Sequence, residues 1–425
     1  MGVSVKYFYS EGYGCALNLS ETEMINGFLV KNDFIQIQDL KKADFVIINT
    51  CSVKQVTEQR MVSRIKNLLK EKKPKSKLLV FGCLASAQHE TIEKINPEII
   101  VLDNNLASLC NALKIPPQQF SPKITPIKSK EFISIIPLST GCLNFCTYCS
   151  TRLARKMLKS YSTESILSAF RRAINGDELN KPSKEIWLTS QDLGCYGFDI
   201  NSSLVNLLKQ ILKINGNYRI RLGMMNPNHF IKIKKDLLPI MKDERIYKFL
   251  HLPLQSGSNK ILKLMNRTYS VEEFIECVNY ARKIIPNITI ATDIIVGFPN
   301  ENCEDFKETI KVLEKTKPDI VNISRFGKRK GTYAEKMKGQ LTEKEKKNRS
   351  RILSNVCKNF FLKNCEDFLG KEILCLVSEK TKNGFNAHTN EYKTVFVKKG
   401  YGDFVKARIT QIKRHYFIGE VMDTK

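Results

Sequence analysis

Histidine, tryptophan and long apolar runs are scarce in this chain of 425 residues. The sequence has five His and one Trp, so a metal site built from imidazole ligands is a weak option. It contains no run of about 18 or more apolar residues, and a membrane-spanning helix is therefore not expected. The N-terminus lacks the pattern of a secretory signal. These absences predict a cytoplasmic protein without a membrane partner.

Acidic residues are also few, because 43 Asp and Glu face 69 Lys and Arg and leave a net charge of +26. The excess is uneven. Residues 54–77 carry nine basic side chains against two acidic ones, and residues 326–363 carry twelve against three. Such a charge favours a polyanionic partner, of which RNA or DNA is the commonest. The alternative is a lysine-rich but evenly solvated surface.

Cysteine, in contrast, is abundant, with 13 residues. In a cytoplasmic chain this number points to metal or redox chemistry rather than to a disulfide framework. Cys142, Cys146 and Cys149 follow an apolar run at 132–138 in the spacing C-x3-C-x2-C. Three thiolates in so short a loop can bind one small inorganic group, but no fourth ligand is evident. A structural zinc ion requires four ligands, whereas a [4Fe–4S] cluster bound by three thiolates leaves one iron open.

Strand and helix patterns alternate over the first 115 residues. Apolar segments predict strands at 3–9, 45–48, 78–81 and 99–102, with helices at 18–31 and 55–72. This alternation predicts an open parallel α/β sheet.

Three cysteines occupy equivalent places in this predicted sheet. Cys15, Cys51 and Cys83 each come just after the carboxyl end of a strand. Those ends lie along one edge of a parallel sheet, where ligands bind, so we expect the three thiols to converge. They could hold a second [4Fe–4S] cluster. The alternative is three buried structural cysteines, since Cys is among the most buried residue types.

A second series of strands and helices follows a Pro- and Gln-rich linker at 116–122. The predicted strands are 132–138, 185–190, 218–225, 247–252, 288–296 and 319–324, with helices at 163–175, 203–213, 271–285 and 303–315. Six such units resemble the partial (β/α)6 barrel of radical S-adenosylmethionine (SAM) enzymes. In β/α barrels the active site lies at the carboxyl ends of the strands, where the cysteine loop and several polar segments occur.

The cysteine loop 141–149, with Tyr148 before its last Cys, itself resembles the radical SAM enzymes, in which SAM occupies the open iron. Five segments at strand ends resemble most the archaeal and eukaryotic branch of the MiaB/RimO methylthiotransferases, namely 13–18, 49–53, 188–192, 223–227 and 251–258. In that branch the substrate is N6-threonylcarbamoyladenosine at position 37 of tRNA. The resemblance covers nearly the whole chain. It departs from the family at Lys156 and Asn300, where the family usually has Gly, but no ligand is lost.

The resemblance implies a role for each of these residues. Cys142, Cys146 and Cys149 would hold the [4Fe–4S] cluster that reduces SAM to a 5′-deoxyadenosyl radical. Cys15, Cys51 and Cys83 would hold an auxiliary [4Fe–4S] cluster that presents sulfur. The radical would abstract the C2 hydrogen of the adenine, and a second SAM would supply the methyl group. No side chain is expected to be catalytic, because the clusters and SAM carry the chemistry. The expected SAM contacts are Tyr148, Gln191, Gln255, Asp293 and Gly297.

The last part of the chain changes from helix to short strands. Residues 341–363 predict a strongly basic helix, either a solvated linker or an RNA contact, in which Thr342 and Glu345 have the spacing of a capping box. Four strands are predicted at 372–377, 393–397, 403–409 and 416–421, with a turn at 382–384. This all-β module resembles a TRAM domain, a small RNA-binding barrel. Residues 366–425 carry 11 basic and 8 acidic side chains. We therefore expect local RNA contacts, through Tyr392, Phe396 and Phe417 if exposed, rather than bulk attraction.

Together with these patterns, the resemblance implies a monomer of three domains: an N-terminal methylthiotransferase α/β domain at 1–115, a radical SAM core at 128–360 and a TRAM domain at 366–425. The partners that the resemblance implies are the anticodon loop of ANN-decoding tRNAs and an electron donor such as a flavodoxin or ferredoxin. Other readings stay open: the same chemistry on isopentenyladenosine-37 of tRNA or on a ribosomal protein aspartate, a non-catalytic Fe–S protein that binds RNA, and a zinc protein. Cys195 could face the site, but structural burial is expected for it.

Overall fold

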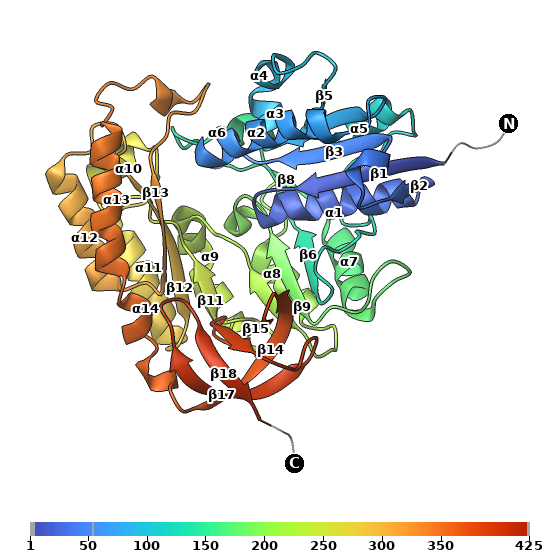
Figure 1. Ribbon diagram of the computed structural model, residues 1–425. Helices are drawn as coiled ribbons and strands as arrows, with labels where there is room; N and C mark the ends of the chain where they lie inside the picture. Colours follow the sequence, from blue (N-terminus) through green and yellow to red (C-terminus); the bar gives the residue numbers. More distant parts are fainter. Residues whose placement is uncertain (1–4, 53–54, 423–425) are drawn as a thin grey trace.

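The computed structural model describes residues 5–52 and 55–422. Residues 3 and 4 of the first expected strand, and Val53 of the segment 49–53, lie outside the described residues. Figure 1 shows an α/β unit at the N-terminal end, a central barrel of strands and helices, and a small β-barrel at the C-terminal end. This is the fold class that the sequence predicted. None of the helices in the described ranges is long and apolar enough to cross a bilayer.

The N-terminal part is a five-stranded parallel sheet in the order β2-β1-β3-β4-β5. Helices α1 (Ala16–Val30) and α5 (Leu106–Leu113) cover one face, and α2 (Gln55–Glu71) covers the other. Adjacent residues of β3 face opposite sides, as strand geometry requires, so Ile47 packs under α1 while Val46 packs under α2. The strands are β1 (Lys6–Gly12), β2 (Phe34–Gln36), β3 (Phe45–Thr50), β4 (Lys77–Gly82) and β5 (Ile100–Val101).

The central barrel consists of six parallel strands in two sheets, ordered β10-β9-β6 and β11-β12-β13. The strands are β6 (Ile133–Pro137), β9 (Glu185–Thr189), β10 (Arg219–Leu222), β11 (Phe249–His251), β12 (Thr289–Val296) and β13 (Ile320–Arg325). A bridge from Ile220 to Ile246 joins the two sheets beside β11. The expected partial (β/α)6 barrel is therefore confirmed.

Amphipathic helices cover the outside of this barrel, and their apolar faces form one large core with the strands. They are α7 (Thr163–Asn175), α8 (Leu204–Ile211), α9 (Pro227–Ile240), α10 (Asn259–Leu264), α11 (Val271–Ile284) and α12 (Cys303–Thr316). The short helix α6 (Ser150–Arg155) follows the cysteine loop directly.

The basic segment 341–363 is two helices rather than one. Helix α13 (Glu343–Cys357) begins with the expected capping box of Thr342 and Glu345, and α14 (Phe360–Lys363) follows after a break. Helix α14 contacts both barrels, because Phe360 belongs with Leu353 to the core of the central barrel whereas Phe361 belongs to the core of the C-terminal barrel.

The C-terminal part is a closed barrel in the order β14-β15-β16-β18-β17. Its strands are β14 (Glu372–Thr381), β15 (Gly384–His388), β16 (Thr394–Val397), β17 (Phe404–Ile412) and β18 (Phe417–Val421). Strand β15 was missed because its first residue, Gly384, reads as part of a turn. The expectation of RNA stacking fails at Phe417, which is fully buried in the barrel core. It also fails at Tyr392, whose ring packs against the rings of Tyr247 and Phe249.

The C-terminal barrel docks on the central barrel around the carboxylate of Glu185 in β9. This carboxylate accepts hydrogen bonds from Ser378 (2.6 Å) and Tyr247 (3.1 Å) and pairs with His388 (3.2 Å), and it is fully buried. Burial opposes the ionisation of Glu185, but the charge and hydrogen bond of His388 hold its pKa low, at about 2. A buried carboxylate is retained only when it is paired in this way.

Candidate active site

The cysteine loop lies at the carboxyl end of β6 and is held from both sides. Gly141 has φ +73, and a Cβ there would come within 1.8 Å of the Met157 carbonyl oxygen, so only Gly fits. The Thr147 N–H donates to the Met265 carbonyl (3.1 Å), and the Thr147 carbonyl accepts from the Ala334 N–H (2.9 Å). The loop is thus fixed between α10 and the segment after β13.

Two residues direct N–H groups at the sulfur atoms of this loop. Asn144 donates to Cys142 Sγ from its backbone N (3.4 Å) and from Nδ2 (3.3 Å), and Arg267 Nη1 donates to Cys146 Sγ (3.3 Å). Burial, followed by the charge of Asp192, raises the pKa of the Cys142 thiol to about 11. Hydrogen bonds to sulfur are a known means of tuning thiolate-bound clusters. The N–H groups at Cys142 and Cys146 therefore fit sulfur atoms that carry negative charge as ligands of a cluster.

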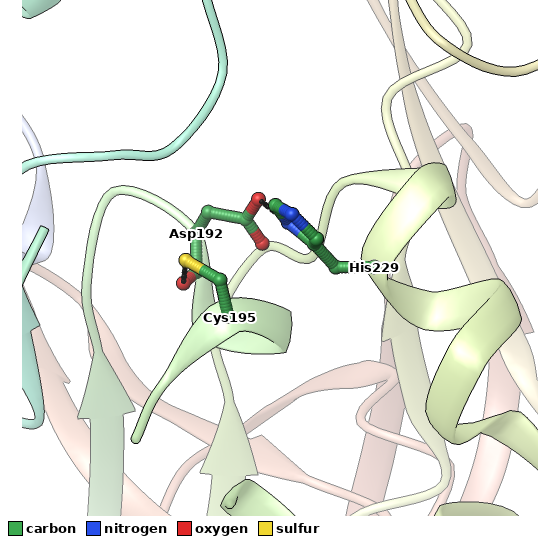
Figure 2. A group of neighbouring side chains, drawn as sticks. All are labelled: Asp192, Cys195 and His229. Atoms are coloured by element: carbon green, nitrogen blue, oxygen red, sulfur yellow. Dashed lines mark hydrogen bonds and ion pairs between the residues drawn. The ribbon is translucent and has the colours of Figure 1, made fainter. Parts of the chain in front are cut away.

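Asp192, Cys195 and His229 lie close together, as Figure 2 shows. Their ligand atoms are near enough for a metal ion, but hydrogen bonds already occupy the Asp192 carboxylate. Oδ1 accepts from the backbone N–H groups of Gly194 (3.1 Å) and Asn226 (3.0 Å). Oδ2 lies 2.6 Å from His229 Nδ1 and accepts from Asn144 Nδ2 (3.0 Å). The group therefore orients Asn144. Cys195 is fully buried, as expected.

A cavity of about 530 Å³ opens beside the cysteine loop at the carboxyl ends of β12 and β13. Three of the five expected SAM contacts line it, together with Cys149: Tyr148, Gln255 and Asp293. Gln255 has a left-handed backbone (φ +69), and its Oε1 atom is buried without a hydrogen-bond partner among the described residues. The Asp293 carboxylate is oriented by Asn322 Nδ2 (2.8 Å) and lies 3.0 Å from His251 Nε2. The cavity thus presents a fixed carboxylate and an unused amide oxygen.

The other two expected SAM contacts, Gln191 and Gly297, do not line this cavity. Gln191 follows β9, and its Oε1 is also buried without a described partner. Gly297 has φ +73, its N–H donates to Glu301 (3.0 Å), and a Cβ there would come within 2.4 Å of the Lys346 side chain. The geometry of Gly297 is accounted for by the packing of α13.

The structure brings Cys15, Cys51 and Cys83 together at the carboxyl edge of the N-terminal sheet. Cys15 precedes α1, Cys51 follows β3, and Cys83 begins the short helix α3 (Cys83–Ala87). Asn18 Oδ1 lies 3.9 Å from Cys15 Sγ and 3.6 Å from Cys83 Sγ. A Cβ at Gly14, which has φ +108, would come within 2.7 Å of Cys51 Sγ. The loop before α1 therefore approaches β3 as closely as Gly permits.

Arg155, the last residue of α6, connects this second cysteine group to the first. Its Nε donates to Cys83 Sγ (3.3 Å), and its Nη2 donates to Asn18 Oδ1 (2.7 Å) and to Glu21 Oε2 (2.7 Å). The side chains of Arg155 and Glu21 are 2% and 1% exposed. Because α6 begins directly after Cys149, one helix of six residues spans the distance between the two groups.

The sequence reasoning missed the residues that contact the sulfurs. Arg155 was not among the expected site residues, because its contact with Cys83 depends on how α6 packs against the N-terminal sheet. Asn144 and Arg267 carry no local signal, because their contacts depend on how the barrel closes around the loop.

The two departures from the family, Lys156 and Asn300, both have left-handed backbone, with φ +56 and +65. Gly adopts this conformation without cost, which accounts for Gly in the family. Asn also tolerates it, and Asn300 Nδ2 gains a hydrogen bond to the Lys338 carbonyl (3.2 Å). Lys156 has ψ −141, close to a region that is almost restricted to Gly. The backbone at Lys156 is therefore strained, whereas that at Asn300 is compensated.

Three family descriptions match successive parts of the chain. Uncharacterized protein family UPF0004 matches residues 7–103, the radical SAM superfamily matches residues 136–313, and the TRAM domain matches residues 367–422. The first match contains Cys15, Cys51 and Cys83, and the second contains Cys142, Cys146 and Cys149.

Relatives are similar over nearly the full length. A probable threonylcarbamoyladenosine tRNA methylthiotransferase from Pyrococcus horikoshii is 37% identical over 97% of this chain and 99% of its own. A tRNA-2-methylthio-N(6)-dimethylallyladenosine synthase from Thermodesulfovibrio yellowstonii is 33% identical over 98% and 99%. Among solved structures, the radical SAM methyltransferase TsrM from Kitasatospora setae has the same fold over 76% of this chain and 75% of its own, with a TM-score of 0.55 and 11% identity. The chain belongs to the radical SAM methylthiotransferase family, the MiaB-like proteins in which UPF0004 and TRAM domains flank a radical SAM core.

Proposed function

We propose that this chain replaces the C2 hydrogen of N6-threonylcarbamoyladenosine at position 37 of tRNA with a methylthio group. One observation carries this proposal: Arg155 joins the helix after Cys149 to the Sγ of Cys83 (3.3 Å), so two groups of three cysteines lie at adjoining edges of two domains. The C2 hydrogen is neither acidic nor attached to an electrophilic carbon. Acid–base residues cannot replace such a hydrogen with sulfur, whereas a radical can.

The residues present fit the cofactors of this reaction. The radical SAM family brings one [4Fe–4S] cluster and SAM, and Cys142, Cys146 and Cys149 are the thiols that would hold that cluster. We infer a second [4Fe–4S] cluster at Cys15, Cys51 and Cys83, because they offer the same set of three thiols near a common point. When bound, the clusters and SAM supply the radical, the sulfur atom and the methyl group.

The chain's own residues position and enclose the reacting groups. Asn144 and Arg267 direct N–H groups at the sulfurs of the first cysteine group, and Asp293 and Gln255 offer oriented oxygen atoms in the adjoining cavity. Burial raises the pKa of the Cys83 thiol to about 11, and the buried positive charge of Arg155 beside it opposes that rise. Holding the groups in fixed positions contributes to the rate without any change in the chemistry.

The lining of the cavity supports the threonylcarbamoyl substrate over an isopentenyl one. Of the residues that β13 contributes to the lining, Asn322, Ser324 and Arg325 are polar and only Ile323 is apolar. Polar side chains suit a group that carries a hydroxyl, a urea and a carboxylate, whereas an isopentenyl group would be better served by apolar side chains. The relative with a dimethylallyl substrate in its name is also the less identical of the two described above.

A tRNA partner accords with the net charge of +26 and the TRAM domain. The anticodon loop of ANN-decoding tRNAs would present an unstacked base to the cavity, and the affinity would fall steeply as salt rises. Reduction of the first cluster requires a donor, for which a flavodoxin or ferredoxin remains our prediction.

Mass spectrometry of tRNA nucleosides, from cells with and without the gene, tests the proposal. We expect the 2-methylthio-N6-threonylcarbamoyladenosine signal to disappear without the gene and to return with the wild-type gene but not with a Cys83→Ala gene. Persistence of that signal in the deletion strain would rule out the proposed substrate. Loss of a methylthiolated isopentenyladenosine, or of a methylthiolated ribosomal aspartate, would identify a rival substrate.

Metal analysis of the reconstituted protein separates the remaining rivals. About eight irons per chain, with matching sulfide, agree with two [4Fe–4S] clusters. Zinc alone would contradict the proposal. Two intact clusters without SAM cleavage would indicate a non-catalytic Fe–S protein.

A further inference from the structure

Two cations, Arg325 and Arg329, line the cavity beside the cysteine loop, and their surroundings differ. Arg329 Nη1 lies 2.6 Å from Glu58 Oε1 of α2, and the two side chains are only 8% and 14% exposed. Arg329 is thus committed to joining the N-terminal domain to the central barrel. Arg325, the last residue of β13, is 42% exposed, and its nearest carboxylate, on Glu343, is 3.7 Å away. An ion pair this long and exposed contributes little to stability.

Arg325 can leave Glu343 without exposing an unpaired charge. Glu343 Oε1 accepts a hydrogen bond from Lys346 Nζ (2.7 Å) one helical turn later in α13. That hydrogen bond, and the charges of Lys346 and Arg325, hold the pKa of Glu343 below its ordinary value. If Arg325 moved to another carboxylate, Lys346 would still neutralise Glu343. The guanidinium is therefore available to a ligand in the cavity.

Position also favours Arg325 as a ligand contact. It stands at the carboxyl end of a barrel strand, where active sites of β/α barrels lie. Asn322 and Ser324 from the same strand line the cavity beside it, and Cys149 of the cysteine loop lines the same cavity. A ligand that contacts Arg325 would therefore share one cavity with the radical SAM loop.

We propose that Arg325 binds the carboxylate of the N6-threonylcarbamoyl group and thereby determines the substrate. This inference rests on the proposed function, because it assigns one end of that substrate to one side chain. A guanidinium offers paired N–H donors that match both oxygens of a carboxylate, and hydrogen bonds between charged groups are the strong ones. An isopentenyl group has no hydrogen-bond acceptor, so its binding would leave the guanidinium without a partner in the cavity. A site built to hydrogen-bond one substrate group strongly rejects an analogue that lacks this group.

The test measures methylthiolation kinetics of the reconstituted holoenzyme with two substrates, tRNA carrying N6-threonylcarbamoyladenosine-37 and tRNA carrying isopentenyladenosine-37. We expect Arg325→Gln to lower kcat/KM for the threonylcarbamoyl substrate on the order of 50-fold, the equivalent of one or two charge-assisted hydrogen bonds. The rate with the isopentenyl substrate should stay the same or rise. Arg325→Lys keeps the charge but not the paired donors, so its kcat/KM for the threonylcarbamoyl substrate should lie between those of the wild type and Arg325→Gln. Arg351→Gln, on an exposed part of α13 that does not line the cavity, serves as the matched control.

A second measurement separates Arg325 from the SAM site and from folding. Binding of N6-threonylcarbamoyladenosine tRNA and of unmodified tRNA is compared for each holoenzyme, together with 5′-deoxyadenosine formed in the absence of tRNA. We expect Arg325→Gln to abolish the preference for the modified tRNA, with a KM for SAM in 5′-deoxyadenosine formation equal to that of the wild type. A raised KM for SAM would instead assign Arg325 to the SAM carboxylate and overturn the inference, as would an unchanged preference. If the wild-type enzyme itself fails on the threonylcarbamoyl substrate, the proposed function fails before any variant is made.

Discussion

The Nε atom of Arg155 donates a hydrogen bond to the Sγ atom of Cys83 over 3.3 Å, across the boundary between the radical SAM core and the N-terminal domain. The same guanidinium pairs with Glu21 of α1, which is almost fully buried. A charge in such a place is stable only while its partner is present. The contact that orients the two cysteine groups is therefore also a contact on which the domain interface depends.

Arg155→Ala is expected to destabilise this interface strongly. The variant leaves the Glu21 carboxylate buried and unpaired, which costs about 3–5 kcal/mol. Calorimetry should show a lower unfolding temperature, and methylthiolation should be lost. The double variant Arg155→Met/Glu21→Leu serves as the control, because an apolar pair of similar volume should recover the stability but not the sulfur transfer. Recovery of both would show that Arg155 has only a structural role.

Asn144→Ala is expected to make the first cluster harder to reduce. Each N–H to sulfur bond favours the reduced cluster, which carries more negative charge. Loss of the side-chain bond to Cys142, worth about 1 kcal/mol, corresponds to a shift on the order of 50 mV toward negative potential for a one-electron couple. A redox titration followed by electron paramagnetic resonance measures it, and the second cluster should not shift. An unchanged reduction potential of the first cluster would show that the Asn144 side chain does not tune it.

Glu185→Gln is expected to weaken the docking of the C-terminal barrel in a pH-dependent way. Because the pKa of Glu185 is lowered to about 2, its ionised form stabilises the folded protein above the ordinary pKa of about 4.3, and this stabilisation is lost as the pH falls toward 2. From the shift the effect is on the order of 3 kcal/mol at pH 7. Thermal unfolding between pH 7 and pH 3 should show the gap between variant and wild type narrowing with acid.

Asp403→Asn is the matched control for Glu185. Asp403 pairs with Lys184 (2.7 Å) between the same two parts of the chain, but its side chain is 69% exposed. An exposed pair of this kind is worth less than about 1 kcal/mol, so the control should barely change the unfolding temperature. Equal effects of the two variants would mean that burial of Glu185 is not what makes it important.

Lys156→Gly is expected to stabilise the protein. The backbone at Lys156 (φ +56, ψ −141) costs on the order of 1–3 kcal/mol for a residue with a Cβ. Gly removes that cost but loses somewhat more entropy on folding, which leaves a gain of about 1 kcal/mol. The unfolding temperature should rise by a few degrees. Asn300→Gly should not stabilise, since it removes the hydrogen bond to Lys338.

The sequence predicted what depends on local order along the chain. The spacing of Cys142, Cys146 and Cys149 lies within one loop, and the alternation of strands and helices places Cys15, Cys51 and Cys83 at one sheet edge without any knowledge of packing. The three-part fold followed from the same periodicities.

What the sequence did not reveal depends on contacts between distant segments. The partners of Arg155 lie more than 70 positions away, and Tyr392 is covered by aromatic residues of another domain. The neighbouring residues Phe360 and Phe361 of α14 belong to the cores of two different barrels. The hydrophobic periodicity of a single segment does not reveal which distant segment it packs against.

The most direct test of the two-cluster account compares Cys15→Ala, Cys51→Ala and Cys83→Ala with Cys142→Ala, Cys146→Ala and Cys149→Ala, by measuring 5′-deoxyadenosine and methylthiolated tRNA in the same reactions. The account predicts that each variant of the first set still forms 5′-deoxyadenosine and yields no methylthiolated tRNA, whereas each variant of the second set forms neither. Methylthiolation by any variant of the first set, at a rate near that of the wild type, would contradict it.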